Sequence, residues 1–125
     1  MKPRLGVLVS GGGTTLENFL DLEGRGELAG EVALVVSSDP AAGACERARK
    51  AGKPLEIVEW GKGASEAVTK ALLRERVDLV LMAGFLRLYR FPEEFSGRVL
   101  NIHPSLLPAF GGKGMWGPTS IPARR

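Results

Sequence analysis

The sequence predicts an α/β domain with a doubly wound, mostly parallel, Rossmann-like sheet, and two observations carry this prediction. Short apolar runs recur along the chain without alternating polar residues, which is typical of strands buried on both faces. Between these runs, apolar residues repeat with the spacing of a helix face. Strands that alternate with amphipathic helices form a parallel sheet covered on both sides through right-handed crossovers.

The elements follow in a regular order along the chain. Strands are expected at residues 5–9, 32–36, 55–59, 79–83 and 98–102. The first helix follows a glycine loop, the second runs from Ala41 until Gly52 stops it, and the third carries apolar residues at 64, 67, 68, 71 and 72. From Pro104 onward neither period is visible. We therefore divide the chain into an α/β domain at residues 1–103 and a Pro/Gly-rich loop with an atypical tail at residues 104–125.

The composition indicates an ordinary globular domain and bears on its cellular location. The chain has 125 residues and a mean hydropathy of +0.02. It has no run of about 18 apolar residues, so we expect no contact with a membrane. Cys45 is the single cysteine, which excludes an internal disulfide and suits a reducing, cytoplasmic location. An exposed strand edge invites pairing with another chain, which leaves a homodimer open.

The charge distribution argues against a nucleic-acid partner. The net charge is +3, yet residues 1–94 carry 13 Lys and Arg against 14 Asp and Glu. The excess comes from residues 95–125, which hold four Lys or Arg and no carboxylate. Nucleic-acid binding needs a contiguous basic surface with interleaved aromatic residues, and this sequence lacks one. We expect small-molecule substrates.

A glycine loop follows the first expected strand. Ser10–Thr15 reads SGGGTT and opens a helix, where free backbone N–H groups and the helix dipole favour an anion. The dinucleotide fingerprint requires glycine where Leu16 stands, and a P-loop requires a Gly-Lys-Ser/Thr ending. The loop therefore favours a monophosphate. The alternative is a tight turn that only lets the helix pack on the strand.

Asn101 and His103 lie at the end of the fifth expected strand. Because side chains alternate along a strand, both point to the same side. A carboxamide donor beside an imidazole suits stabilisation of an oxyanion and transfer of a proton near neutral pH. Ligands of open α/β sheets bind at the carboxyl ends of the strands, where this pair, the glycine loop and residues 84–89 all fall.

Three segments together resemble the folate-dependent formyltransferases, and among them the phosphoribosylglycinamide formyltransferases. They are Ser10–Leu16 (SGGGTTL), Met82–Leu88 (MAGFLRL) and Asn101–Phe110 (NIHPSLLPAF), which occur in the order and at the spacing typical of the family. The resemblance extends from residue 5 to about residue 117. It implies a Rossmann-like fold and transfer of a formyl group from 10-formyltetrahydrofolate to the amine of 5-phosphoribosylglycinamide, in purine synthesis, without a metal ion.

The resemblance also implies a role for each matching residue. The phosphate of the ribonucleotide is expected at Gly13, Thr14 and Thr15. The folate is expected against the backbone and apolar groups of Leu86, Arg87, Leu88 and Tyr89. Asn101 is expected to bind the formyl carbonyl of the folate, and His103 to act as proton donor or oxyanion partner.

The sequence departs from the family pattern in three places. The family uses an aspartate in a later loop to orient the histidine, whereas the last acidic residue here is Glu94. Ser65 stands about where relatives carry an arginine. After Gly117 the chain has two prolines where the family continues into a helix; a shifted reading frame, a short variant and a fragment remain open. We expect substrate binding to survive and turnover to be impaired.

Two classes of alternative remain. One is another folate-dependent enzyme, either a methionyl-tRNA formyltransferase or a formyltetrahydrofolate hydrolase; the glycine-rich first loop disfavours both. The other is a non-catalytic module that binds a phosphorylated metabolite or a dinucleotide, and Leu16 counts against the dinucleotide.

Overall fold

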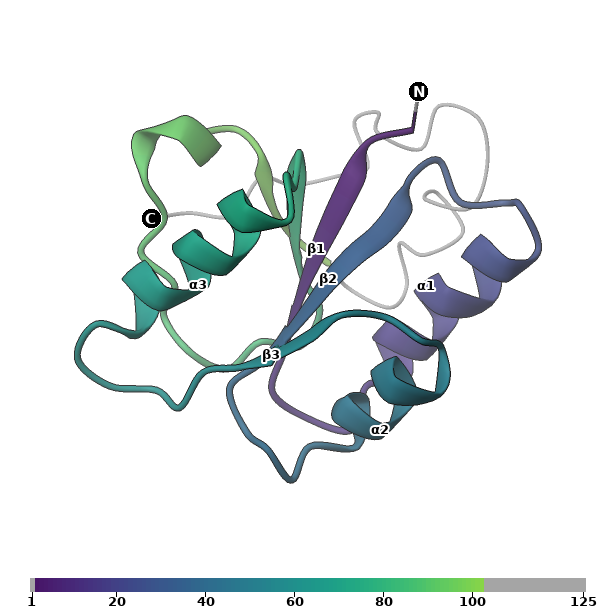
Figure 1. Ribbon diagram of the computed structural model, residues 1–125, viewed down its shortest axis with the longest axis horizontal. Helices are drawn as coiled ribbons and strands as arrows, with labels where there is room; N and C mark the ends of the chain where they lie inside the picture. Colours follow the sequence, from purple (N-terminus) through teal and green to yellow (C-terminus); the bar gives the residue numbers. More distant parts are fainter. Residues whose placement is uncertain (1, 103–125) are drawn as a thin grey trace.

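A computed structural model describes residues 2–102 of the chain (Figure 1). Its strands are β1 (Arg4–Val9), β2 (Glu31–Ser37), β3 (Leu55–Ile57), β4 (Leu79–Met82) and β5 (Val99–Asn101). Its helices are α1 (Thr14–Gly24), α2 (Gly43–Lys50), α3 (Ala64–Arg74) and the short 3-10 helix η1 (Glu93–Phe95). The expected division of the chain at residue 103 lies outside the described residues.

Within the described part of the chain, the strands form one parallel sheet in the order β3-β2-β1-β4-β5. From β1 the strands β2 and β3 follow toward one edge of the sheet, and from β4 the strand β5 follows toward the other edge. The two directions separate between β1 and β4, and this is the topological switch point of the doubly wound fold. The predicted fold class is confirmed.

The sheet separates two hydrophobic clusters, and α1 and α2 cover one face while α3 covers the other (Figure 1). Strand residues alternate between the clusters: Leu5, Val7 and Val9 face α1 and α2, whereas Leu8 faces α3. Each central strand therefore buries side chains on both sides, which explains the continuous apolar runs in the sequence.

Gly6 lets α3 pack closely on β1. A Cβ at this position would lie 2.5 Å from Leu72 Cδ2 and within 3.2 Å of both Val77 methyl carbons. An added methyl group would require the Leu72 side chain to shift, because the packed core leaves no free space at this position.

Several element boundaries differ from the expected ones by a few residues. β3 ends at Ile57 rather than at residue 59, because its partner strand β2 ends at Ser37, which pairs with Ile57. α2 begins at Gly43 rather than at Ala41, because the Asp39 carboxylate accepts the Ala41 N–H at 2.9 Å and holds a turn there. β5 is shorter than expected at both ends.

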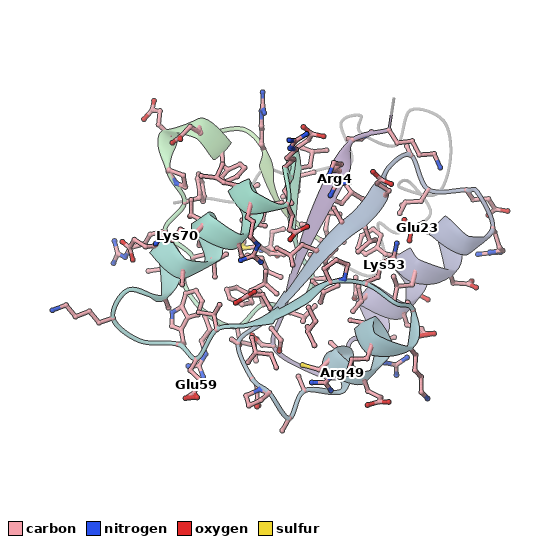
Figure 2. The ribbon with its side chains drawn as sticks, in the orientation of Figure 1. Arg4, Glu23, Arg49, Lys53, Glu59 and Lys70 are labelled. Atoms are coloured by element: carbon pink, nitrogen blue, oxygen red, sulfur yellow. The ribbon has the colours of Figure 1, made fainter. Side chains whose placement is uncertain are left out.

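Ion pairs and hydrogen bonds connect the ends of neighbouring helices and strands. Figure 2 shows Glu23 and Lys53 facing each other. Their side chains are 2.7 Å apart, and the second Glu23 oxygen accepts the Val32 N–H at 2.9 Å. Arg4 similarly donates its Nε–H to the Glu75 carbonyl and pairs with Glu31. These contacts join the end of α1 to β2, and β1 to the end of α3.

Candidate functional site

The predicted ligand segments meet at the carboxyl ends of three adjacent strands. The register aligns Leu8 of β1 with Met82 of β4, and Met82 with Asn101 of β5. The glycine loop, the loop that begins at Gly84 and Asn101 therefore leave the sheet at the same level. This edge includes the switch point between β1 and β4, where doubly wound sheets bind their ligands.

The glycine loop is held against α2 by its carbonyl groups. The Ala44 N–H donates to the Gly11 carbonyl at 3.2 Å, and Arg47 Nε–H donates to the Gly12 carbonyl at 2.9 Å. Gly13 is the N-cap residue of α1 with a left-handed φ of 85°, and a Cβ there would lie 2.6 Å from the Ala44 Cα. Only glycine satisfies both the backbone angle and this contact.

The N-terminus of α1 follows Gly13 and has no side-chain cap. The first N–H groups of any helix have no partner within it, and Thr14 is exposed while Thr15 is half-buried. Glu17 would repel an anion from the first turn, but Arg47 Nη1 lies 3.1 Å from its carboxylate. The geometry thus suits a monophosphate at Gly13, Thr14 and Thr15.

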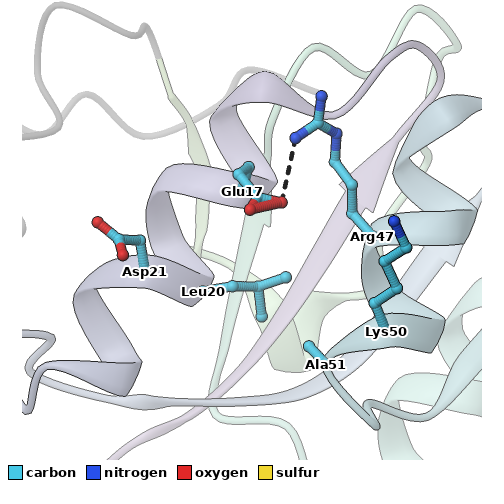
Figure 3. Close-up of a pocket in the computed structure, with 6 residues that line it drawn as sticks. All are labelled: Glu17, Leu20, Asp21, Arg47, Lys50 and Ala51. Atoms are coloured by element: carbon cyan, nitrogen blue, oxygen red, sulfur yellow. Dashed lines mark ion pairs between the residues drawn. The ribbon is translucent and has the colours of Figure 1, made fainter.

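Arg47 also borders a shallow depression between α1 and α2, shown in Figure 3. It has a volume of about 260 Å³ and is lined by Glu17, Leu20, Asp21, Arg47, Lys50 and Ala51. Its two acidic side chains come from α1 and its two basic side chains from α2, and the Glu17–Arg47 pair joins the two sides. The charges balance, so this depression has no net preference for an anion or a cation.

The loop at residues 84–89 divides between the surface and the core. Leu86 and Leu88 are 82% and 56% exposed, and Arg87 is also exposed. Tyr89 is only 3% exposed; its hydroxyl lies 2.6 Å from Thr69 Oγ1 of α3. Burial raises the pKa of Tyr89, an effect that the hydrogen bond with Thr69 partly offsets. Three of the expected folate residues therefore face solvent, whereas the Tyr89 side chain packs inward.

A second depression adjoins this loop on the side of α3. It has a volume of about 310 Å³, and its lining includes Trp60, Lys62, Ser65, Leu88 and Arg90. Ser65 Oγ accepts the Arg90 N–H at 2.9 Å, and the ring of Trp60 meets Phe85 edge to face at 5.2 Å. Lys62, which the sequence pattern did not single out, lies in the segment between β3 and α3.

The expected pair of Asn101 and His103 is only partly described. Asn101 ends β5 and is exposed, so its carboxamide is accessible beside the loop at residues 84–89. His103 lies outside the described residues. Between residues 2 and 102, no group of three His, Cys, Asp or Glu side chains is placed to hold a metal ion. Across the same residues, no helix has the length and apolar character needed to cross a membrane.

Comparison with known proteins agrees with the geometry of this edge. The family model described as formyl transferase matches residues 3–117. The chain is 39% identical to the chloroplastic phosphoribosylglycinamide formyltransferase of Arabidopsis thaliana, covering 93% of this chain and 42% of the relative. It is 34% identical to the phosphoribosylglycinamide formyltransferase of Haemophilus influenzae, covering 87% of this chain and 55% of the relative.

Solved structures show the same likeness. The glycinamide ribonucleotide transformylase 1 of Symbiobacterium toebii superposes with a TM-score of 0.76 at 42% identity, covering 91% of this chain and 57% of that one. The glycinamide ribonucleotide transformylase 1 of Geobacillus kaustophilus superposes with a TM-score of 0.73 at 36% identity, covering 95% of this chain and 67% of that one. The chain spans about half the length of the curated relatives described above. By its sequence, its fold and the residues at its sheet edge, it belongs to the formyl transferase family.

Proposed function

We propose that this chain binds 5-phosphoribosylglycinamide and 10-formyltetrahydrofolate and transfers the formyl group between them. The observation that carries the proposal is the meeting of the glycine loop, the exposed loop at residues 84–89 and Asn101 at one level of one sheet edge. Phosphoribosylglycinamide formyltransferases among the relatives support the choice of substrates.

The phosphate of the ribonucleotide is assigned to the N-terminus of α1. Gly13, Thr14 and Thr15 offer backbone N–H groups there, and the helix dipole adds a favourable field. The folate is assigned to the other side of the switch point. Leu86 and Leu88 expose apolar surface to its ring system, and Arg87 offers a cation to an acidic part of the same ligand.

The proposed chemistry is an acyl transfer. The amine of the glycinamide attacks the formyl carbon and forms a tetrahedral intermediate. The Asn101 carboxamide donates a hydrogen bond to the developing oxyanion, and His103 donates a proton to the departing nitrogen of the folate. Collapse of the intermediate breaks the bond between that nitrogen and the formyl carbon and releases tetrahydrofolate. The attacking amine releases one proton to water and His103 recovers one from water, so protons balance over the reaction.

The test is a single-turnover assay with the 125-residue chain in excess over both substrates. The release of tetrahydrofolate is measured for the wild type, Asn101→Ala and Asn18→Ala. Loss of an oxyanion donor costs on the order of 100- to 1000-fold in rate, so Asn101→Ala is expected to be slower by that factor. Asn18 is exposed on α1, and its variant should match the wild type.

Other outcomes identify the alternatives. Release of formate without any amine acceptor would indicate a formyltetrahydrofolate hydrolase, and transfer only to a charged tRNA would indicate a methionyl-tRNA formyltransferase. Binding of ribose 5-phosphate with no chemistry on 10-formyltetrahydrofolate, even after prolonged incubation, would favour a non-catalytic module. A homodimer and a cytoplasmic location stay predictions from the sequence, as does the lack of a nucleic-acid partner.

A further inference from the structure

We propose that Ser10 is a positioning residue that holds the loop at residues 84–89 in its ligand-binding conformation. The inference rests on the proposed function, which assigns that loop to the folate. Ser10 directly follows β1 and is the first residue of the glycine loop. Its Oγ accepts the Leu86 N–H at 3.0 Å and lies 2.7 Å from Ser38 Oγ, just beyond the end of β2.

One oxygen atom therefore joins the segments that follow β1, β2 and β4. It spans the switch point, because β1 and β4 are the neighbours between which strand order reverses. The hydrogen bond links the two loops that the proposed function assigns to different ligands. It connects residues 76 positions apart in the sequence, so local propensity does not account for it.

The other described anchors of this loop lie toward α3. Phe85 meets Trp60, and Tyr89 pairs with Thr69. Between them, Leu86 and Leu88 expose large apolar side chains that gain little from packing. Ser10 is thus the contact that fixes the exposed middle of the loop from the side of the glycine loop.

Such a contact acts on affinity through preorganisation. A loop that is already ordered loses less conformational freedom when a ligand binds. Removing the hydroxyl removes one hydrogen bond from the free protein and leaves the loop to be ordered by the ligand. A hydrogen bond of ordinary strength corresponds to a change of about fivefold to tenfold in an equilibrium constant.

The first test measures amide hydrogen exchange by NMR without any ligand. In the wild-type chain, the Leu86 amide is expected to exchange about tenfold more slowly than the amides of Arg87 and Leu88, after correction for intrinsic rates. Ser10→Ala should remove this protection. Ser38→Ala is the matched control, because it removes the contact with Ser10 and leaves the one with Leu86.

The second test measures the dissociation constants of 10-formyltetrahydrofolate and of ribose 5-phosphate by titration calorimetry. Ser10→Ala is expected to weaken folate binding about fivefold to tenfold, with a smaller change for ribose 5-phosphate. Ser10→Thr keeps the hydroxyl and should restore both the protection of Leu86 and folate affinity. A general loss of structure would affect every amide and both ligands alike.

The outcomes separate the two proposals. A wild-type chain that binds no 10-formyltetrahydrofolate contradicts the proposed function, and the exchange measurement alone then decides the positioning role of Ser10. An unprotected Leu86 amide in the wild type overturns the inference, even where Ser10→Ala does not fold. The inference is also overturned if the Leu86 amide stays protected in Ser10→Ala. It is overturned as well if Ser38→Ala lowers folate affinity as much as Ser10→Ala does.

Discussion

The glycine loop needs Gly13 for two reasons, its backbone conformation and its packing against α2. Its left-handed φ begins α1, and its missing side chain lets α2 approach within contact distance. The same close approach places Ala44 and Arg47 where they bind the carbonyls of Gly11 and Gly12. These two carbonyls are bonded by groups of α2, and the N-terminus of α1 is where we propose the phosphate to bind.

We expect Gly13→Ala to destabilise the fold more than an alanine at another left-handed glycine. The matched control is Gly26→Ala, since Gly26 has a φ of 72° but nothing within 4 Å of an added Cβ. The backbone alone costs about 1–2 kcal/mol, and the contact with Ala44 adds about 1–3 kcal/mol. Urea denaturation measures both free energies of unfolding. Equal losses in the two variants would show that α2 moves aside without cost.

Tyr89 makes the stability of the fold sensitive to alkaline pH. Burial raises its pKa in the folded chain, so the unfolded chain loses this proton first, near the usual value of about 10. The contribution is fully present below that pH and is lost as the pH rises through the folded pKa. The difference in unfolding free energy between wild type and Tyr89→Phe, followed from pH 7 to 11, is expected to shrink.

The same pair of proteins provides the control at neutral pH. Tyr89→Phe loses the hydrogen bond with Thr69, which costs about 1 kcal/mol. Groups other than Tyr89 titrate equally in both proteins and cancel in the difference. A difference that does not change across this pH range would contradict the assignment of the shift to burial of Tyr89.

At the scale of elements, α3 shows which features hydrophobic periodicity predicts and which it does not. Its apolar residues predicted a helix that packs on the sheet, and Val68, Ala71 and Leu72 are buried there. The spacing does not reveal which face of the sheet α3 covers, or that Gly6 of β1 lies under Leu72. Those features depend on contacts between segments far apart in the sequence.

Leu72 and Leu73 form a matched pair for testing this packing. Leu72 is fully buried and Leu73 is 50% exposed, one residue further along the same helix. Leu72→Ala is expected to cost about 2–5 kcal/mol through lost burial and the cavity it leaves. Leu73→Ala should stay within about 0.5 kcal/mol of wild type. Thermal or urea unfolding of both variants measures this, and similar losses would mean that α3 is oriented differently.

For the whole molecule, the proposed phosphate site links ligand binding to stability. A ligand that binds the folded chain alone stabilises it by about 1.4 kcal/mol at ten times its dissociation constant. Ribose 5-phosphate is therefore expected to raise the melting temperature by a few degrees, whereas ribose, which lacks the phosphate, should not. The rise should be lost in Gly13→Ala. An equal rise in melting temperature with ribose would show that the phosphate does not cause the stabilisation.

The sequence alone determined the order of the elements and the parallel sheet, because these depend on short-range periodicity. It also predicted three ligand segments from their motifs. It also placed Asn101 at a strand end, where the structure has it. It did not separate Tyr89 from its exposed neighbours, because the partner that holds its hydroxyl is Thr69, twenty residues earlier on α3.

Only the tertiary structure decided how the segments lie relative to one another. The order of strands set the switch point between β1 and β4, and the register brought the ends of β1, β4 and β5 to one level. The bond between Ser10 and Leu86 follows from both. The physical reason is that local propensity acts over a few residues, whereas strand order and register are selected by burial on both faces of the sheet at once.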